Sequence, residues 1–300
     1  MKLISEEVKS EHGKKILFNE KLSNYSWFNL GGLSEVFFKP KSVEDIVLFL
    51  KKVKPKKITI IGAGSNTLIR DGGVKGITIK LSPHFSHLNL ASSNVIEAGA
   101  ATLDKKIADF ALKNSLTGLE FLSCIPGSIG GAIRMNSGCY GADVSQILHS
   151  IKVIDIFGNE KDILASNIKF FYRDSSLDHN LIITSVKLKG KPFLKEKIQE
   201  RQQALIDQKK NSQPSQVKTG GSTFKNTKNK KAWELIKESN CQDLHVGNAK
   251  ISNKHCNFFI NDGKATAKDL EDLINKVKEK VYQKTKINLE LEIKIIGQNK

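Results

Sequence analysis

Residues 122–144 read LSCIPGSIGGAIRMNSGCYGADV, a run in which glycines stand among short hydroxyl and amide residues. A second glycine-rich run, IIGAGSNTLIRDGG at 60–73, ends a strand-like segment upstream. Glycine reaches backbone angles closed to other residues and lets main-chain N–H groups come close to phosphate oxygens. Each run alone would also fit an ordinary turn, but the two together favour a phosphate-bearing cofactor.

The bulk composition is that of a globular protein with more than one lobe. The chain has 300 residues, of which 39% are hydrophobic and 26% charged, so a sizeable core is possible. It has no run of eighteen apolar residues, and its opening MKLISEEVKSEHGKK carries charges where a signal peptide needs an apolar stretch. These features predict a soluble, cytoplasmic protein with no membrane partner.

Charge and cysteine usage narrow the function classes further. The four cysteines form no C-x-x-C pair and the seven histidines form no H-x-H or H-E-x-x-H pattern, so neither a metal site nor a disulfide is expected. The net charge of +17 would suit nucleic acid or an anionic small substrate. Because the lysines are spread along the whole chain, a solvated lysine-rich surface is the simplest interpretation.

Hydrophobic periodicity predicts an α/β lobe in the first third of the chain. A helix is expected over 43–53, with Ser42 as N-cap and Asp45 as its partner in the first turn. Strands are expected at 57–61 and 76–81, on either side of the second glycine run. The polar stretch 82–94 is interpreted as a lobe boundary.

The next third is expected to begin with a strand over 95–100 and a helix that starts at Thr102. One face of that helix would carry Leu103, Ile107, Phe110 and Ala111. Hairpin strands are expected at 147–156 and 162–165 around Gly158-Asn159, a turn-forming pair. The segment 170–175 and a strand over 181–188 complete this lobe.

The last third opens with a polar linker, 189–195, and a lysine- and glutamine-rich helix that ends near residue 211. A third glycine element, TGGSTFKN, occupies 219–226 and precedes a helix over 232–239 and a strand over 257–261. A long helix should begin at Thr266, which forms a capping box with Asp269. Its buried stripe would consist of Leu270, Leu273, Ile274, Val277 and Val281.

The closing segment, 287–296, alternates strictly between apolar and polar residues and is expected to be a strand. The polar face carries Glu292, which points either to solvent or into a cleft. No internal repeat or low-complexity tract is present.

Seven blocks, in this order, resemble the UDP-N-acetylenolpyruvoylglucosamine reductase (MurB) family. They span about residues 20 to 297 and read YSWFNLGG, GAGSN, IPGSIGGA, MNSGCYG, YRDSS, GGSTFKN and EIKIIG. GAGSN alone is weak, but the ordered set is specific. The chain lacks an inserted tyrosine-bearing loop between the flavin lobes and the C-terminal lobe, so it is closer to the type II form of the family.

The resemblance implies an α+β fold: a two-lobed FAD-binding domain of the vanillyl-alcohol-oxidase (PCMH) type plus a C-terminal α+β substrate-binding domain. The expected boundaries are an N-terminal segment over 1–20, the FAD-binding domain over 21–190 and the substrate-binding domain over 191–300. The implied reaction reduces the enolpyruvyl ether of UDP-N-acetylglucosamine to UDP-N-acetylmuramate with NADPH, in peptidoglycan precursor synthesis. No stable protein partner and no nucleic acid is implied.

The resemblance also assigns three catalytic residues, one in each of three blocks. Arg173 would bind the negative charge that develops on the substrate carboxylate when hydride reaches the vinyl carbon. Ser222 would protonate the resulting carbanionic carbon, and Glu292 would be a second polarising group. Without the resemblance, Ser222 would be interpreted as a loop hydroxyl and Arg173 as half of a surface ion pair.

The FAD pyrophosphate would lie against the first two glycine loops. The cofactor-binding residues implied are Gly62, Gly64, Ser65, Asn66, Gly127, Ser128, Gly130, Gly131, Ala132, Asn136 and Gly138. In the third element Lys225 and Asn226 would contact the substrate. Tyr140 and Tyr172 are expected to be structural.

Two departures from the family pattern occur, Thr227 where proline is usual and Ser26 where threonine is usual. Two rival functions stay open. One is an FAD-dependent oxidase of the same fold, which needs no proton donor at Ser222. The other is a basic nucleic-acid-binding protein, which predicts steeply salt-dependent binding and a colourless preparation.

Overall fold

The structure, a computed structural model, describes residues 4–55 and 57–300. The chain forms two compact units, and each is built from several separate segments. The first unit contains 1–18, 36–63 and 76–209, and the second contains 19–35, 64–75 and 210–300. The domain boundaries expected near residues 20 and 190 stay predictions. The polar stretch 82–94, expected as a lobe boundary, lies inside the first unit.

A small α/β layer belongs mostly to unit one, although 19–21, 33–35 and 74–75 of its strands are counted in unit two. Its helices are α1 (Glu6–His12) and α2 (Val43–Val53), and its sheet has the order β1-β2-β5-β3. The Ser42 hydroxyl accepts the Asp45 N–H and so caps α2, which confirms the predicted start of this helix. The strands are β1 (Ile16–Lys21), β2 (Leu33–Phe38), β3 (Ile58–Ile60) and β5 (Val74–Ile79).

This layer buries an aromatic core. Phe38 and Phe49 stack with ring centroids 4.0 Å apart, and the edge of the His12 ring meets both. The His12 side chain is buried, and among the residues that the structure describes neither ring nitrogen has a hydrogen-bond partner. Burial lowers the pKa of His12, so its neutral form is favoured in this core.

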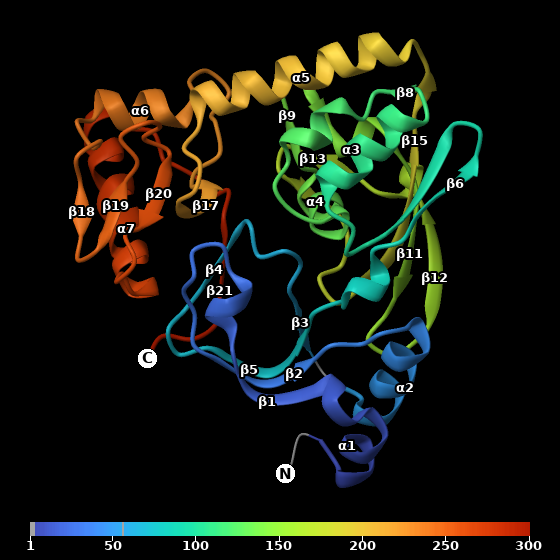
Figure 1. The fold of residues 1–300 in the computed structure, drawn as a ribbon. Helices are drawn as coiled ribbons and strands as arrows, with labels where there is room; N and C mark the ends of the chain where they lie inside the picture. Colours follow the sequence, from blue (N-terminus) through green and yellow to red (C-terminus); the bar gives the residue numbers. More distant parts are fainter. Residues whose placement is uncertain (1–3, 56) are drawn as a thin grey trace. The chain divides into compact units, whose positions relative to one another are not determined.

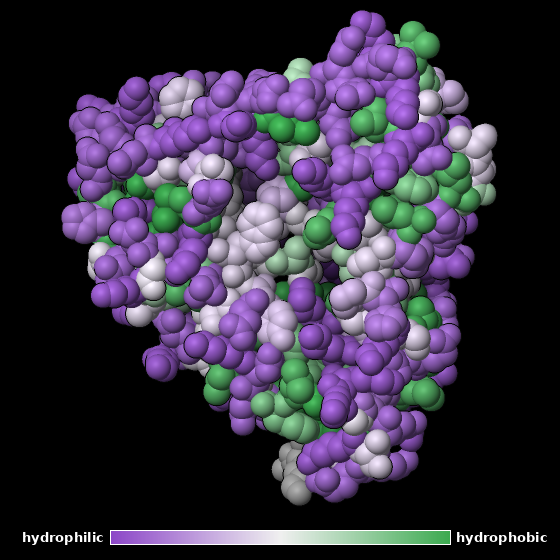
Figure 2. All heavy atoms as spheres, in the orientation of Figure 1, coloured by the Kyte–Doolittle hydropathy of each residue, from purple (hydrophilic) through white to green (hydrophobic). Residues whose placement is uncertain are grey.

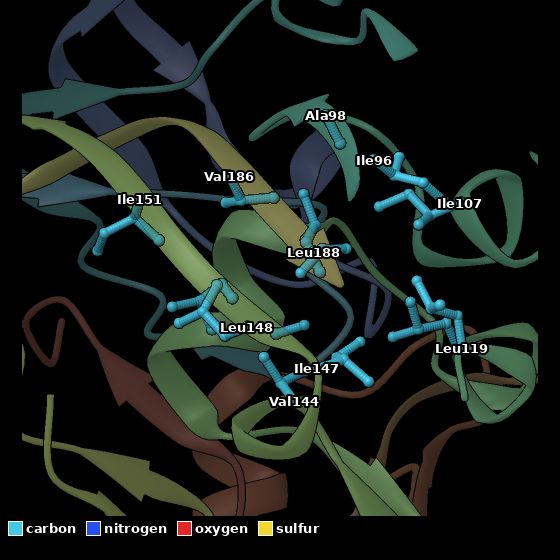
Figure 3. Packing of buried hydrophobic residues seen from close by; sticks show 14 of the residues in the cluster. Ile96, Ala98, Ile107, Leu119, Val144, Ile147, Leu148, Ile151, Val186 and Leu188 are labelled. Atoms are coloured by element: carbon cyan, nitrogen blue, oxygen red, sulfur yellow. The ribbon is translucent and has the colours of Figure 1, made fainter. Parts of the chain in front are cut away.

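The second part of unit one is a five-stranded antiparallel sheet with the order β12-β11-β15-β7-β6. Helices α3 (Asp104–Lys113) and α4 (Ile129–Met135) accompany it, and α4 contacts β7 and β15 (Figure 1). Apolar side chains from three strands and α3 point toward one another in the core (Figure 3). The strands are β6 (Leu88–Ser92), β7 (Val95–Gly99), β11 (Leu148–Ile154), β12 (Glu160–Leu164) and β15 (Ile182–Lys189).

The hairpin predicted around Gly158-Asn159 is confirmed, because β11 pairs with β12 in antiparallel register. The long helix α5 (Lys195–Ser212) follows and matches the predicted lysine-rich helix. Shorter strands complete the pairing in this unit. They are β8 (Leu116–Thr117), β9 (Gly138–Cys139), β10 (Ala142–Asp143), β13 (Phe170–Phe171), β14 (Asp174–Ser175) and β16 (Lys191–Pro192).

Unit two packs helices against the four-stranded sheet β17-β20-β19-β18. Helix α7 (Ala267–Thr285) contacts β18, β19 and β20 and also α6 (Ala232–Glu238) (Figure 1). The capping box between Thr266 and Asp269 is present, and the whole predicted stripe of α7 is buried. The remaining strands are β4 (Thr67–Ile69), β17 (Lys218–Ser222), β18 (His245–Val246), β19 (Ala249–Ile251), β20 (Phe258–Asn261) and β21 (Lys294–Ile296).

Three predictions of secondary structure were wrong in part. The helix predicted from Thr102 begins at Asp104, and Leu103, assigned to its buried face, is 46% exposed. The stretch 82–94 contains a strand, β6, whose short, mostly exposed sequence LNLAS has no buried face that would predict it. Only 294–296 of the predicted strand 287–296 is a strand, although Leu289 and Ile293 are buried as the alternation predicts.

The surface matches the charged composition. Hydrophilic residues cover most of the face drawn in Figure 2, and hydrophobic ones appear in small scattered groups. Within 4–55 and 57–300, no helix combines the length and the apolar character that a membrane span requires. The same residues contain no cluster of three or more histidine, cysteine or acidic side chains that would suit a metal ion.

Candidate active site

The first glycine run forms the entrance of helix α4 in unit one. Residues 127–131, called the glycine loop below, lie along the segment 100–104. The N–H groups of Ile129 and Gly130 donate to the carbonyls of Thr102 and Ala100 at 3.0 Å each. These bonds fix the backbone of the loop against the sheet, because Ala100 directly follows β7.

The outer side of the glycine loop is open. A Cβ at Gly131 would meet no heavy atom within 4 Å, apart from the helix's own backbone. No hydrogen bond between described residues reaches the N–H groups of Gly127 and Ser128. Unpaired N–H groups at a glycine-rich helix entrance are suited to an anionic group. The loop could therefore hold a cofactor phosphate, and the contact expected from the sequence stays a prediction.

The GAGSN run is divided between the units, with Gly62 in the first and Gly64, Ser65 and Asn66 in the second. In unit one, a Cβ at Gly62 would lie 3.2 Å from the Ser128 hydroxyl oxygen, so Gly62 lies beside the glycine loop. The Lys80 ammonium group donates to the Gly62 carbonyl. Burial, aided by the charge of Lys39, lowers the pKa of Lys80.

In unit two, Gly64 serves backbone packing. Its φ is +72°, and a Cβ there would lie 1.9 Å from the Tyr25 carbonyl oxygen. The Trp27 N–H donates to the Gly64 carbonyl at 3.0 Å. The YSWFNLGG block thus runs directly against the GAGSN run, and only glycine permits the approach. Ser65 is half-buried.

Asn66 connects the GAGSN run to the catalytic glutamate predicted from the sequence. Its side-chain nitrogen donates to the Glu292 carbonyl at 3.0 Å, and its own carbonyl accepts the Lys294 N–H at 2.9 Å. The sequence suggested a cofactor contact for Asn66. The structure adds a second role, because Asn66 holds the backbone that carries Glu292.

Ser222 and Glu292 come together in unit two. Ser222 ends β17 opposite Phe258, just after a bulge that contains Gly220 and Gly221. The Glu292 N–H donates to the carbonyl of Thr223, the residue that follows Ser222, at 2.8 Å. Both side chains are half-buried. The catalytic hydroxyl and carboxyl predicted from the sequence are therefore carried by adjacent, hydrogen-bonded backbone segments.

The same pairing continues one step further along the third glycine element. The Lys225 N–H donates to the Glu290 carbonyl at 2.8 Å, and the two side chains form an ion pair at 3.8 Å. The Asn226 side-chain oxygen accepts the Ala232 N–H at 3.0 Å and so caps the entrance of α6. Lys225 and Asn226 thus both have protein partners in addition to any ligand.

Arg173 lies in unit one, at the tip of a tight hairpin between β13 and β14. Its φ is +59°, which suits the third residue of the four-residue β-turn 171–174. The guanidinium carbon lies 4.9 Å from the centroid of the Tyr172 ring, a cation–π arrangement. Tyr172 therefore supports the arginine, in line with the structural role predicted for it.

Three other residues of the predicted cofactor set are internal to unit one. Ala132 is buried in α4. Gly138 permits the hairpin of β9 and β10, since a Cβ there would lie 2.3 Å from the Ala142 carbonyl oxygen. Asn136 is buried and makes side-chain hydrogen bonds to the carbonyl of Phe171 and the N–H of Ser145.

A buried carboxyl group, which sequence reasoning missed, lies beside the glycine loop. Asp104 is the first residue of α3, and its N–H donates to the Gly127 carbonyl at 3.2 Å. Its side chain is fully buried, and neither oxygen has a hydrogen-bond partner among the described residues. Burial raises the pKa of Asp104 well above its usual range. In the sequence this residue resembles any acidic residue at a helix start.

Comparison with known proteins gives consistent results. Residues 213–296 match the family described as UDP-N-acetylenolpyruvoylglucosamine reductase, C-terminal domain, and residues 34–162 match an FAD-binding domain family. UDP-N-acetylenolpyruvoylglucosamine reductase of Pelagibacter ubique is 47% identical over 96% of both chains. The enzyme of that name from Orientia tsutsugamushi strain Ikeda is 44% identical over 93% of both.

A solved structure agrees with these relatives. The crystal structure of UDP-N-acetylenolpyruvylglucosamine reductase (MurB) from Thermus caldophilus has a TM-score of 0.82 and 32% sequence identity. The match covers 94% of this chain and 98% of that one. An α+β fold that joins an FAD-binding domain to a MurB C-terminal domain follows, as the sequence predicts.

Proposed function

From the premise that this chain belongs to the UDP-N-acetylenolpyruvoylglucosamine reductase family, and is therefore an oxidoreductase with an FAD-binding domain, we propose its specific reaction. The enzyme uses NADPH to reduce the enolpyruvyl ether of a UDP-N-acetylglucosamine to the lactyl ether. The product, UDP-N-acetylmuramate, is a precursor of peptidoglycan, and the proposed location is the cytoplasm.

The glycine loop and its neighbours are the proposed FAD site. FAD, when bound, supplies the hydride for the vinyl carbon. The open face at Gly131 and the unpaired N–H groups of Gly127 and Ser128 would hold an anionic part of it. Gly62, which lies beside the glycine loop, would allow close backbone approach, and the Ser65 hydroxyl from the second run would be a side-chain donor.

Arg173 is the proposed charge-binding group. Hydride addition at the vinyl carbon places negative charge on the neighbouring carbon and its carboxylate. A guanidinium offers a planar pair of donors that matches a carboxylate and binds it more strongly as this charge grows. The stacking of Arg173 on Tyr172 supports this role, because it restricts the conformations of a long side chain.

Ser222 is the proposed proton donor to the carbanionic carbon, and Glu292 the proposed group that shares a proton with the substrate carboxylate. A hydroxyl is a weak acid in water, so a serine in this role needs a fixed position and excluded solvent. The observation that carries this proposal is the 2.8 Å hydrogen bond from the Glu292 N–H to the carbonyl next to Ser222. It holds the two groups on neighbouring segments.

Substrate binding is proposed for Lys225 and Asn226. The Lys225 side chain is 20% exposed and its ion pair with Glu290 is long, so its ammonium group can also bind a diphosphate. The Asn226 side-chain oxygen caps α6, and the amide nitrogen carries two N–H donors that could bind the substrate.

The test separates the two half-reactions under anaerobic conditions. NADPH should bleach the flavin spectrum of the purified protein, and the enolpyruvyl sugar nucleotide should restore it. Ser222→Ala should slow reoxidation by the substrate by about 10²–10⁴-fold and leave reduction by NADPH unchanged. The matched control is Ser239→Ala, in the same unit, whose buried hydroxyl has no partner among the described residues.

Each failure has a distinct meaning. A wild-type protein that is reduced but not reoxidised by the sugar nucleotide would refute the proposed substrate. Full activity of Ser222→Ala would refute the protonation role and favour an oxidase of the same fold. A colourless protein that binds DNA or RNA with steep salt dependence would refute both flavin-based functions.

A further inference from the structure

Asn136 is a buried residue whose side chain links two other backbone segments of unit one by hydrogen bonds. It ends α4 with φ +44° in the left-handed region, which asparagine tolerates better than most residues. Its side chain is 4% exposed. The amide nitrogen donates to the Phe171 carbonyl at 3.1 Å, and the amide oxygen accepts the Ser145 N–H at 3.0 Å. Donor and acceptor are thus each used within unit one.

The carbonyl that Asn136 binds belongs to the hairpin of Arg173. Phe171 is the last residue of β13 and pairs with Asp174, so only Tyr172 and Arg173 form the turn between them. A second bond ties the same hairpin to α4, because the Ser175 hydroxyl donates to the Arg134 carbonyl at 2.9 Å. Both strands of the hairpin are therefore fastened to the end of the helix that the glycine loop begins.

We infer that Asn136 is a positioning residue for Arg173 and acts by fixing the hairpin rather than by contacting the cofactor. The inference rests on the proposed function, since it requires Arg173 to bind the charge that develops on the substrate. It replaces the cofactor contact that the sequence suggested for Asn136. Arg173 is only two residues after Phe171 in a short turn, so a shift of Phe171 also shifts the Arg173 backbone.

A displaced hairpin should lower the rate because it moves Arg173 out of position. A displacement of about 1 Å at a catalytic group can reduce the rate by about a hundredfold. Asn136→Asp keeps an oxygen for the Ser145 N–H, which Asp143 also accepts, but the ionised variant places a carboxylate oxygen against the Phe171 carbonyl, where an N–H donor stood. At a pH where the new carboxyl is ionised, the two oxygens repel each other and the hairpin must move away from α4.

The test compares Asn136→Asp with Asn114→Asp. Asn114 is a matched control, because its amide nitrogen also donates to a backbone carbonyl at a helix end, that of Phe110 at 2.8 Å. We expect Asn136→Asp to slow reoxidation by the enolpyruvyl sugar nucleotide by about 30–100-fold. The dissociation constant for FAD and the rate of reduction by NADPH should stay within about twofold of wild type. Asn114→Asp should change none of the three.

A double-mutant cycle with Arg173→Lys separates positioning from general damage. If Asn136 acts through Arg173, then adding Asn136→Asp to Arg173→Lys should cost less than about threefold further in reoxidation. Fully additive losses would overturn the inference. So would a weaker affinity for FAD with normal reoxidation of the loaded enzyme, or no effect on reoxidation at all.

Two further arms keep the test decisive. If Asn136→Asp does not fold, Ser175→Ala removes the other tie between hairpin and helix and should show the same pattern with a smaller loss; normal reoxidation there would overturn the inference. A failure of the proposed function itself looks different, because the wild-type enzyme would then not be reoxidised by the sugar nucleotide.

Discussion

The glycine loop of unit one and the glycines of unit two look alike in sequence and serve different needs. In unit two, the segments 25–33 and 64–73, called the glycine crossing below, run so close together that backbone atoms fill the space of the missing side chains. At Gly131 in the glycine loop nothing fills that space. Glycine content alone therefore does not identify a ligand site, because a ligand can approach a glycine only where the protein leaves space beside it.

The two regions also differ in whether their carboxyl groups have hydrogen-bond partners. Asp71, in the glycine crossing, accepts the N–H groups of Ala267 and Lys268 at 3.1 Å each and so caps α7. Asp104, beside the glycine loop, is buried without a partner among the described residues. The Asp71 carboxylate is thus hydrogen-bonded within its unit, while the Asp104 carboxyl and the N–H groups of Gly127 and Ser128 have no partner among the described residues.

The largest expected effect concerns Gly64. An alanine there would need φ +72° and would place its Cβ 1.9 Å from the Tyr25 carbonyl oxygen, so backbone must move. We expect Gly64→Ala to lower the free energy of unfolding by at least about 3 kcal/mol, measured by urea denaturation. Gly131→Ala, the same change without a neighbour, should alter it by less than about 1 kcal/mol. Equal losses would contradict the comparison.

The second prediction is that a larger side chain at Gly131, which should matter little for stability, should matter for cofactor binding. Gly131→Leu fills the open face of the glycine loop, so it should weaken FAD binding by about 10–100-fold, or 1.4–2.7 kcal/mol, with little change in stability. Titration of the apoprotein with FAD measures this. Lys105→Leu, at an exposed position of α3 in the same unit, is the control and should keep wild-type affinity. Unchanged affinity in Gly131→Leu would show that this face is not used.

The third prediction concerns pH. The unfolded Asp104 carboxyl has a pKa near 3.9, and burial raises the folded value, so the folded state holds its proton more tightly. This contribution to stability is fully present below about pH 4 and is lost as the pH rises toward the folded value. Unfolding at several pH values between 4 and 8 should show this decline in wild type. Asp104→Asn should lack it and be more stable at neutral pH, by about 1–2 kcal/mol.

A comparison of apoprotein and holoprotein sharpens this third test. Because both Asp104 carboxyl oxygens are buried even without a cofactor, the decline with pH should be the same in the two forms. An identical decline in Asp104→Asn and wild type would assign it to another group, and Asp104 would then no longer distinguish the two regions.

The sequence predicts the regular elements well where one face is buried. The stripe of α7 and the cap at Ser42 follow from spacing alone, and both are confirmed. The segment 287–296 alternates correctly in burial but lacks a neighbouring strand along most of its length, and pairing cannot be read from one segment. Strand β6, LNLAS, was missed because four of its five residues are exposed, so no buried face marks it in the sequence.

The site was predicted by motif, not by geometry. The ordered blocks identify Ser222 and Glu292, and the structure brings their segments together. What the blocks could not show is which of their polar groups bind other parts of the chain: the amides of Asn66 and Asn136 donate to the backbone carbonyls of Glu292 and Phe171. Those partners are more than thirty residues away in the chain, so only the folded structure reveals them.

The smallest expected effect tests whether the glycine crossing is purely structural. Asp71→Asn keeps one acceptor for the N–H groups at the start of α7 but loses the negative charge that favours a helix N-terminus, so it should cost about 0.5–1 kcal/mol of unfolding free energy. Asp272→Asn, which breaks only an exposed pair with Lys268, should cost less than about 0.5 kcal/mol. Because Asp71 serves α7, the affinity for FAD should stay at the wild-type value in both variants. A loss of FAD affinity in Asp71→Asn without a loss of stability would mean that the glycine crossing, like the glycine loop, contributes to the cofactor site.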